Sequence, residues 1–146
     1  MTNYLITGGA GNIGSALATK LAETKDSTIV IIDNLSTGSR SKIPKGDNIR
    51  FINANVNTYK DIVPVFGRFN FDYVFHFAAV VGVKRTLEFP VAVLDDIEGI
   101  KNILSLSKNS GVKRVFYSSS SEVYGEPFEI PQNENTTPLN SRRRRW

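Results

Sequence analysis

Four glycines within seven residues mark the part of the chain best suited to bind a phosphate. They are Gly8, Gly9, Gly11 and Gly14, they fit the spacing G-x-G-x-x-G, and they follow an apolar run at residues 4–6. Glycine allows a sharp turn and a close approach of the backbone to a ligand. Helix-type spacing begins immediately afterwards, so free amide groups and the helix dipole would attract negative charge. The pattern predicts a strand, a tight turn and a helix N-terminus that bind a dinucleotide pyrophosphate.

An acidic residue at the end of the next apolar run separates this prediction from an ordinary strand-to-helix loop. Residues 28–32 are Thr-Ile-Val-Ile-Ile, and Asp33 follows, nineteen positions past Gly14. A carboxylate at the end of the second strand can accept hydrogen bonds from the hydroxyls of the adenosine ribose. It would also repel a 2′-phosphate, which favours NAD over NADP. Arg40 lies close enough in the sequence to keep NADP open.

Strand-like runs recur along the chain, with helical patterns between most of them. They cover residues 3–7, 28–32, 49–52, 73–77 and 114–118. Most are continuously apolar, as expected for parallel strands that are covered on both faces. Alternating strands and helices imply right-handed crossovers. We therefore expect an α/β fold, a Rossmann-type doubly wound parallel sheet in the order 3-2-1-4-5, truncated after about five strands.

The clearest helical pattern runs over residues 91–108. Pro90 suits its first turn and Gly111 suits its C-terminal end. A second pattern, at residues 59–66, predicts a poorer helix because Pro64 lies inside it. One face of the first pattern is apolar and carries Val93, Ile97, Ile100 and Leu104.

Composition predicts one globular domain. The chain has 146 residues, 40% hydrophobic and 22% charged, with no cysteine, so it has no disulfide and no thiolate metal site. We expect no metal, no membrane span and a cytoplasmic location. The net charge of +4 has a local source, because residues 142–145 are all arginine and the other 14 basic residues match 14 acidic ones. Such a tail is typical of a solvated, disordered end, and we expect no specific nucleic-acid binding.

The domain organisation follows from where the apolar rhythm stops. We expect an NAD-binding Rossmann domain over residues 1–125, followed by an irregular polar segment and basic tail over residues 126–146. Within the domain, residues 34–48 have no periodicity and are rich in Ser, Gly, Lys and Pro. This segment is expected to be a long surface connection with at most one turn of helix.

Three motifs resemble those of the extended short-chain dehydrogenase/reductases that act on nucleotide sugars. They are Thr-Gly-Gly-Ala-Gly-Asn-Ile-Gly at residues 7–14, Asp-Asn-Leu-Ser-Thr-Gly at 33–38 and Ser-Ser-Ser-Ser-Glu-Val-Tyr-Gly at 118–125. Residues 76–79 (His-Phe-Ala-Ala) lie where the family's fourth strand meets the cofactor. The resemblance covers residues 1 to about 141. It implies an NAD-dependent, UDP-glucose 4-epimerase-like enzyme, or a related nucleotide-sugar dehydratase or decarboxylase.

The resemblance also implies which residues bind the cofactor NAD. The pyrophosphate would be lined by Gly8, Gly11, Asn12 and Ile13. The adenosine ribose would be held by Asp33 and Asn34. The adenine would be flanked by Asn55 and Val56, where the family usually has Asp followed by a small aliphatic residue. The residues that pack along the cofactor would be Phe77, Ala78 and Ala79.

The serine run would form the substrate end of the site. Ser120 aligns with the family's catalytic Ser/Thr, which hydrogen-bonds the sugar oxygen, and Glu122 matches an acid that decarboxylases and dehydratases use. His76 is interpreted as a satisfied core residue, and Lys84 as an exposed loop lysine. Asp96 takes the place of a frequent Asn.

The family's proton-transfer pair, Tyr-x-x-x-Lys, does not occur in this sequence. None of the five tyrosines is followed by lysine four positions later. We therefore expect the N-terminal part of a nucleotide-sugar epimerase or dehydratase that is inactive alone. A catalytically silent NAD sensor and an interaction module are the alternatives. The helix at 91–108 resembles the one that pairs in family dimers, so self-association is also expected.

Overall fold

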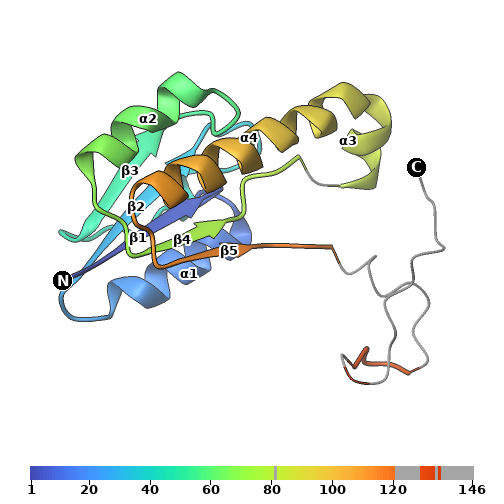
Figure 1. Cartoon of the computed structure of the whole chain (residues 1–146). Helices are drawn as coiled ribbons and strands as arrows, with labels where there is room; N and C mark the ends of the chain where they lie inside the picture. Colours follow the sequence, from blue (N-terminus) through green and yellow to red (C-terminus); the bar gives the residue numbers. More distant parts are fainter. Residues whose placement is uncertain (81, 121–128, 134, 136–146) are drawn as a thin grey trace.

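The structure of the chain is a computed structural model that describes residues 1–80, 82–120, 129–133 and 135. Strands and helices alternate along most of it (Figure 1). In chain order the elements are β1 (Thr2–Thr7), α1 (Asn12–Ala22), β2 (Ser27–Asp33), the 3-10 helix η1 (Arg40–Lys42), β3 (Ile49–Asn53), α2 (Tyr59–Arg68), β4 (Tyr73–His76), α3 (Val83–Glu88), α4 (Pro90–Asn109) and β5 (Arg114–Tyr117).

The strands of the described part form one parallel sheet in the order β3-β2-β1-β4-β5, which confirms the predicted order. β1 lies at the centre and pairs on both sides. Thr7 at its end is in register with Ile32 of β2 and with His76 of β4. The carboxyl ends of these three strands therefore meet at one edge of the sheet.

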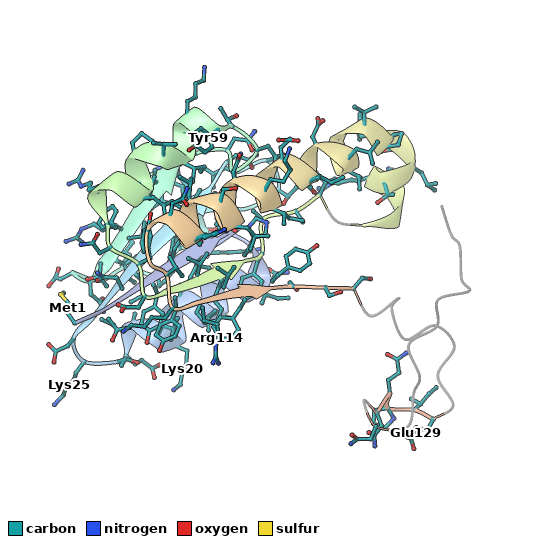
Figure 2. All side chains as sticks on the ribbon, in the orientation of Figure 1. Met1, Lys20, Lys25, Tyr59, Arg114 and Glu129 are labelled. Carbon is teal, nitrogen blue, oxygen red and sulfur yellow. The ribbon has the colours of Figure 1, made fainter. Side chains whose placement is uncertain are left out.

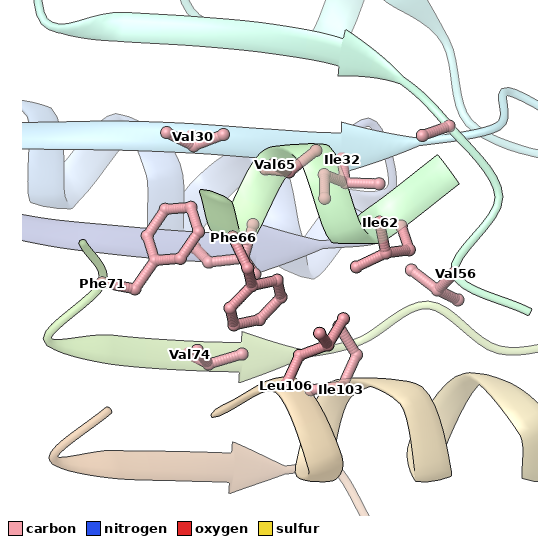
Figure 3. Close-up of a cluster of buried hydrophobic side chains, with 12 residues drawn as sticks. Val30, Ile32, Val56, Ile62, Val65, Phe66, Phe71, Val74, Ile103 and Leu106 are labelled. Carbon is pink, nitrogen blue, oxygen red and sulfur yellow. The ribbon is translucent and has the colours of Figure 1, made fainter. Parts of the chain in front are cut away.

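The two faces of the sheet build two hydrophobic clusters, because successive strand residues point to opposite faces. Leu5 and Val30 join the larger cluster, under α2 and α4 (Figure 3). Ile6 and Ile31 join the smaller cluster, under α1. All four side chains are fully buried. The continuously apolar strands of the sequence are explained by this double coverage.

α2 is a regular helix, although Pro64 lies inside it and predicts a poorer one. Pro64 is exposed, so the backbone carbonyl that loses its partner lies on the solvent side, where water can replace the bond. On the opposite side of α2, Ile62, Val65 and Phe66 are buried against the sheet. This amphipathic burial stabilises the helix.

The sheet-facing side of α4 is not its most apolar stripe. Gly99, Ile103 and Leu106 are buried, whereas Ile97 and Leu104 are 53% and 50% exposed. Gly99 lets the helix approach the loop after β3 closely, since a Cβ there would lie 3.0 Å from Cγ2 of Val56. The close packing at this position therefore requires glycine. An apolar stripe of α4 that includes Ile97 and Leu104 faces outward.

β5 forms one edge of the sheet and is only partly covered. Arg114, which Figure 2 labels, begins this strand. Its guanidinium lies 6.0 Å from the ring centre of Phe116. The Phe116 ring in turn stacks on Phe75 of β4 at 4.6 Å. In the part of the chain that the structure describes, no helix is long and apolar enough to cross a membrane.

Candidate dinucleotide-binding site

The candidate site lies where β1, β2 and β4 end. The chain leaves β1 toward β2 on one side and later returns to β4 on the other, so β1 is the point at which the strand order reverses. Ligands of open α/β sheets bind outside the carboxyl ends of the strands at such a point. The glycine turn, Asp33 and the segment after His76 all meet here.

The glycine turn begins at a position where only glycine fits well. Gly8 has φ +67°, and a Cβ on it would lie 2.7 Å from the backbone nitrogen of Ala78. Its amide donates to the carbonyl oxygen of Ile32 at 2.8 Å. The turn is thus held between the ends of β2 and β4 by close backbone contacts.

The N-terminus of α1 lacks the usual partners of a helix start. The first amide groups of a helix have no acceptor within it. Gly11, the N-cap residue, has no side chain to accept from them, and the first turn contains no acidic residue. Asn12 and Ile13 follow, and the apolar side chain of Ile13 is 67% exposed. This end therefore presents donors and a positive partial charge to an anion.

Asp33 joins this turn to the end of β2. One carboxylate oxygen accepts a hydrogen bond from the amide of Ala10 at 2.9 Å, and the other accepts from the amide of Leu35 at 2.7 Å. The residue is 8% exposed. A carboxylate has about four lone-pair directions, so Asp33 can still accept from a ligand hydroxyl. The neighbouring Asn34 is exposed and accepts from the amide of Ser36 at 3.0 Å.

The segment after β2 lies against the glycine turn, a contact that no pattern in the sequence predicts. The amide of Ser39 donates to the carbonyl oxygen of Ala10 at 3.0 Å, and Nζ of Lys42 donates to Oδ1 of Asn12 at 2.7 Å. Arg40 holds its guanidinium 5.2 Å from the ring centre of Phe51 on β3. No periodic signal marks these residues, because the segment is irregular apart from η1.

Asn55 and Val56, the expected adenine neighbours, differ in exposure. Oδ1 of Asn55 accepts from the amide of Asn57 at 3.1 Å. Val56 is buried, and its carbonyl oxygen accepts from Nδ2 of Asn102 on α4 at 2.9 Å. Its side chain belongs to the larger hydrophobic cluster.

The residues after β4 run alongside the glycine turn. The amide of Phe77 donates to the carbonyl oxygen of Thr7 at 3.2 Å, and the amide of Ala78 donates to Oγ1 of Thr7 at 3.3 Å. Ala79 is exposed. The predicted line of residues 77–79 is therefore brought to the site.

A buried polar cluster lies at the ends of β1 and β4. Nδ1 of His76 is hydrogen-bonded to Oγ1 of Thr7 at 2.8 Å, which supports the interpretation of His76 as a satisfied core residue. Burial lowers the pKa of His76, and the nearby carboxylate of Asp96 opposes that shift. Asp96 also accepts from the amide of Val80 at 2.5 Å and from Nδ2 of Asn57 at 3.4 Å. Asp96 thus connects α4 to the loops that follow β3 and β4.

The predicted substrate end is only partly described. Ser120 is exposed three residues past β5, at the same edge of the sheet as the glycine turn. Glu122 and the arginine tail lie outside the described residues.

Lys84 is on α3 rather than in a loop, and its Nζ lies 3.8 Å from a carboxylate oxygen of Glu88. No pattern in the sequence predicts this short helix, and its described side chains, at residues 84–88, are not buried.

This parallel sheet, with a glycine turn at the central strand and an acid at the end of its neighbour, is a Rossmann-type α/β fold. Residues 4–144 match the model of the NAD dependent epimerase/dehydratase family, and the chain belongs to that family. The expected resemblance is thereby confirmed.

The chain is similar to several epimerases, among them UDP-glucose 4-epimerases. The UDP-glucose 4-epimerase of Streptomyces lividans is 37% identical over 141 residues, which are 94% of this chain and 42% of that protein. An epimerase structure from Methanothermobacter thermautotrophicus has a TM-score of 0.83 at 34% identity, covering 95% of this chain and 41% of the other. Thermus thermophilus UDP-glucose 4-epimerase, solved in complex with NAD, has a TM-score of 0.82 at 32% identity, covering 95% and 44%. The chain spans about two fifths of each relative's length.

Proposed function

We propose that this chain is the NAD-binding, N-terminal part of a nucleotide-sugar epimerase. The observation that carries the proposal is the carboxylate of Asp33, hydrogen-bonded to the glycine turn in a chain that matches the family over residues 4–144. The uncapped N-terminus of α1 beside it fits a pyrophosphate. The side chain of Ile13 at the same end is 67% exposed, so the described part of the chain leaves this end accessible to solvent.

Each predicted residue has a role in this proposal. The pyrophosphate binds at the glycine turn and the start of α1, through the backbone of Gly8, Gly11, Asn12 and Ile13. The adenosine ribose binds to Asp33 and Asn34. The adenine lies near Asn55 and Val56. The remaining contacts along the cofactor come from Phe77, Ala78 and Ala79. When bound, NAD supplies reversible hydride transfer with the sugar.

Ser120 and Glu122 belong to the substrate end in the same proposal. The hydroxyl of Ser120 donates a hydrogen bond to the sugar oxygen that changes oxidation state, and Glu122 is the acid beside it. A UDP-hexose is the first substrate to test, because two of the three proteins named above are UDP-glucose 4-epimerases.

Calorimetry with NAD⁺ and NADP⁺ tests the cofactor part of the proposal. We expect NAD⁺ to bind and NADP⁺ to bind at least about tenfold more weakly, since a 2′-phosphate would meet the carboxylate of Asp33. Equal affinity for the two would remove Asp33 from the ribose site. The absence of binding to either would refute the proposed function.

The 146 residues alone are expected not to turn over nucleotide sugars. No tyrosine in the sequence has the lysine four positions later that would lower its pKa. Loss of a positioned acid–base group removes about 10²–10⁴ in rate. Incubation with NAD⁺ and UDP-, GDP- and dTDP-sugars should therefore give background product only. Turnover that is abolished by Tyr124→Phe would contradict this and make Tyr124 the base.

Two further parts of the proposal concern partners and location. Copies of the chain associate through the outward apolar stripe of α4, whose Val91 and Leu94 are 69% and 64% exposed. The cytoplasmic location and the lack of specific nucleic-acid binding stay predictions. Cell fractionation and a gel-shift assay would test them.

A further inference from the structure

Two hydrogen bonds hold the segment that follows β2 against the glycine turn. One joins the amide of Ser39 to the carbonyl oxygen of Ala10 at 3.0 Å. The other joins Nζ of Lys42 to Oδ1 of Asn12 at 2.7 Å, across thirty positions of sequence. Gly38 also lies close, since a Cβ on it would be 2.8 Å from the Cβ of Ala10. The ammonium of Lys42 is therefore placed at the first residue of α1.

This position concentrates positive charge. The start of α1 already presents unpaired amide donors, with no side-chain cap and no acidic residue in its first turn. Lys42 adds a full charge within hydrogen-bond distance of that turn. Among the ion pairs of residues 1–80, 82–120, 129–133 and 135, none involves Lys42. An anion at this end would balance both charges.

We infer that Lys42 is a phosphate-binding residue of the dinucleotide site, an inference that rests on the proposed function. Its ammonium pairs with a pyrophosphate oxygen of the ligand while the backbone of the glycine turn holds the other oxygens. Lysine suits this role because it is a compact point charge on a flexible stem. Oδ1 of Asn12 accepts from that ammonium and so holds the charge beside the first turn of α1. Lys42 thereby determines affinity for the diphosphate group rather than for the adenosine.

The test compares Lys42→Met with Lys45→Met in the full chain. Lys45 is exposed on the same segment, so the control removes the same charge three positions away. Binding of NAD⁺ and ADP is measured by calorimetry, and binding of adenosine, which has no phosphate, by NMR titration. We expect Lys42→Met to weaken NAD⁺ and ADP by roughly tenfold or more, as for a lost charged hydrogen bond. Adenosine binding should not change, and the urea midpoint without ligand should fall only slightly, because the lost hydrogen bond is exposed.

The possible results separate this inference from the proposed function. If the wild-type chain binds neither NAD⁺ nor ADP, the proposed function fails and the role of Lys42 fails with it. If the wild type binds both and Lys42→Met binds them equally well, only the role of Lys42 is overturned. An equal loss in Lys45→Met would indicate a general charge effect and overturn it too. So would an equal loss for adenosine, because Lys42 would then shape the segment rather than bind phosphate.

Discussion

The carboxylate of Asp33 is tied to the backbone on two sides. It accepts from the amide of Ala10 in the glycine turn and from the amide of Leu35 in the segment that follows. The side chain of Asp33 therefore positions both the glycine turn and the segment after β2. In the proposed site the cofactor binds beside these two segments. In the proposed site the same carboxylate accepts hydrogen bonds from the ribose hydroxyls. Cofactor binding and local stability therefore depend on the same two oxygens.

Asp33→Ala is expected to weaken NAD⁺ binding by about 1–3 kcal/mol, because charged hydrogen bonds to the ribose hydroxyls are lost. The same change leaves the amides of Ala10 and Leu35 without their acceptor, so the free energy of unfolding of the ligand-free chain should also fall. Calorimetry measures the first loss and urea unfolding without ligand measures the second. Unchanged NAD⁺ affinity in a variant that is folded would exclude Asp33 from the site.

His76 makes stability depend on pH near neutrality. Burial lowers its pKa below the ordinary value of 6.5, and the charge of Asp96 offsets only part of this. As pH falls through about 6.5, the unfolded chain takes up a proton before the folded one does, so acidification favours unfolding. The stability contribution is therefore present above that pH and is lost below it.

His76→Asn removes the titrating ring and keeps a polar group for Thr7. We expect the urea midpoint of the wild type to fall more than that of the variant between about pH 7.5 and about pH 5.5. Asp72 does not interfere in this range, because its hydrogen bond with Lys113 lowers its pKa from an already low ordinary value of 3.8. Parallel pH profiles for the two proteins would contradict the role of His76.

At the scale of elements, the packing of α4 depends on one missing side chain. A Cβ on Gly99 would meet the side-chain oxygen of Asn57 and would lie 3.0 Å from Cγ2 of Val56. These two residues follow β3, in the loop that leads toward α2. The close approach also lets Asp96, one turn earlier on α4, hold Asn57 and Val80.

Gly99→Ala should therefore destabilise the fold, although alanine is the better helix former. We expect a loss of about 1–3 kcal/mol in the free energy of unfolding, since the added methyl overpacks the contact. Gly67→Ala in α2 is the matched control, because a Cβ there has no atom within 4 Å. It should stabilise by about 0.5–1 kcal/mol. Urea unfolding of both variants is the measurement, and equal gains would disprove the contact at Gly99.

The sequence predicts the strands and the position of Asp33 at the end of β2, because both follow a simple physical rule. Buried parallel strands are apolar throughout, and Asp33 follows directly where one of them ends. The position of Lys42 follows no such rule, since it depends on how residues 34–48 fold back over the turn. The outward stripe of α4 was also unpredictable in its direction: Ile97 looks like a core residue until Gly99 is known to face the sheet.

At the scale of the whole molecule, the helices cover the sheet unequally. α1 covers one face and α2 and α4 cover the other, while the outer side of α4 carries exposed apolar residues. β5 adds an edge strand with the partly exposed rings of Phe116 and Tyr117. Uncovered apolar area and an open strand edge both favour association.

Light scattering is expected to detect self-association that grows with concentration. Ile97→Asp places a charge in the outward stripe of α4 and should shift the chain toward monomer. Thr24→Asp adds the same charge after α1, on the opposite face of the sheet, and should leave the association unchanged. A wild type that stays monomeric at high concentration would rule out this interface, as would equal behaviour of the two variants.

The central place of β1 has a consequence for synthesis. β1 precedes every other described element, so it leaves the ribosome before them, and its partner β2 follows within residues 27–33. Its other neighbour, β4, does not emerge until residues 73–76. Strands β1, β2 and β3 can therefore pair early, while one side of β1 keeps its amides and carbonyls without partners. Until β4 pairs with β1, the nascent chain is most open to wrong pairing along the free side of β1. In the finished protein the same strand is the central and best protected one.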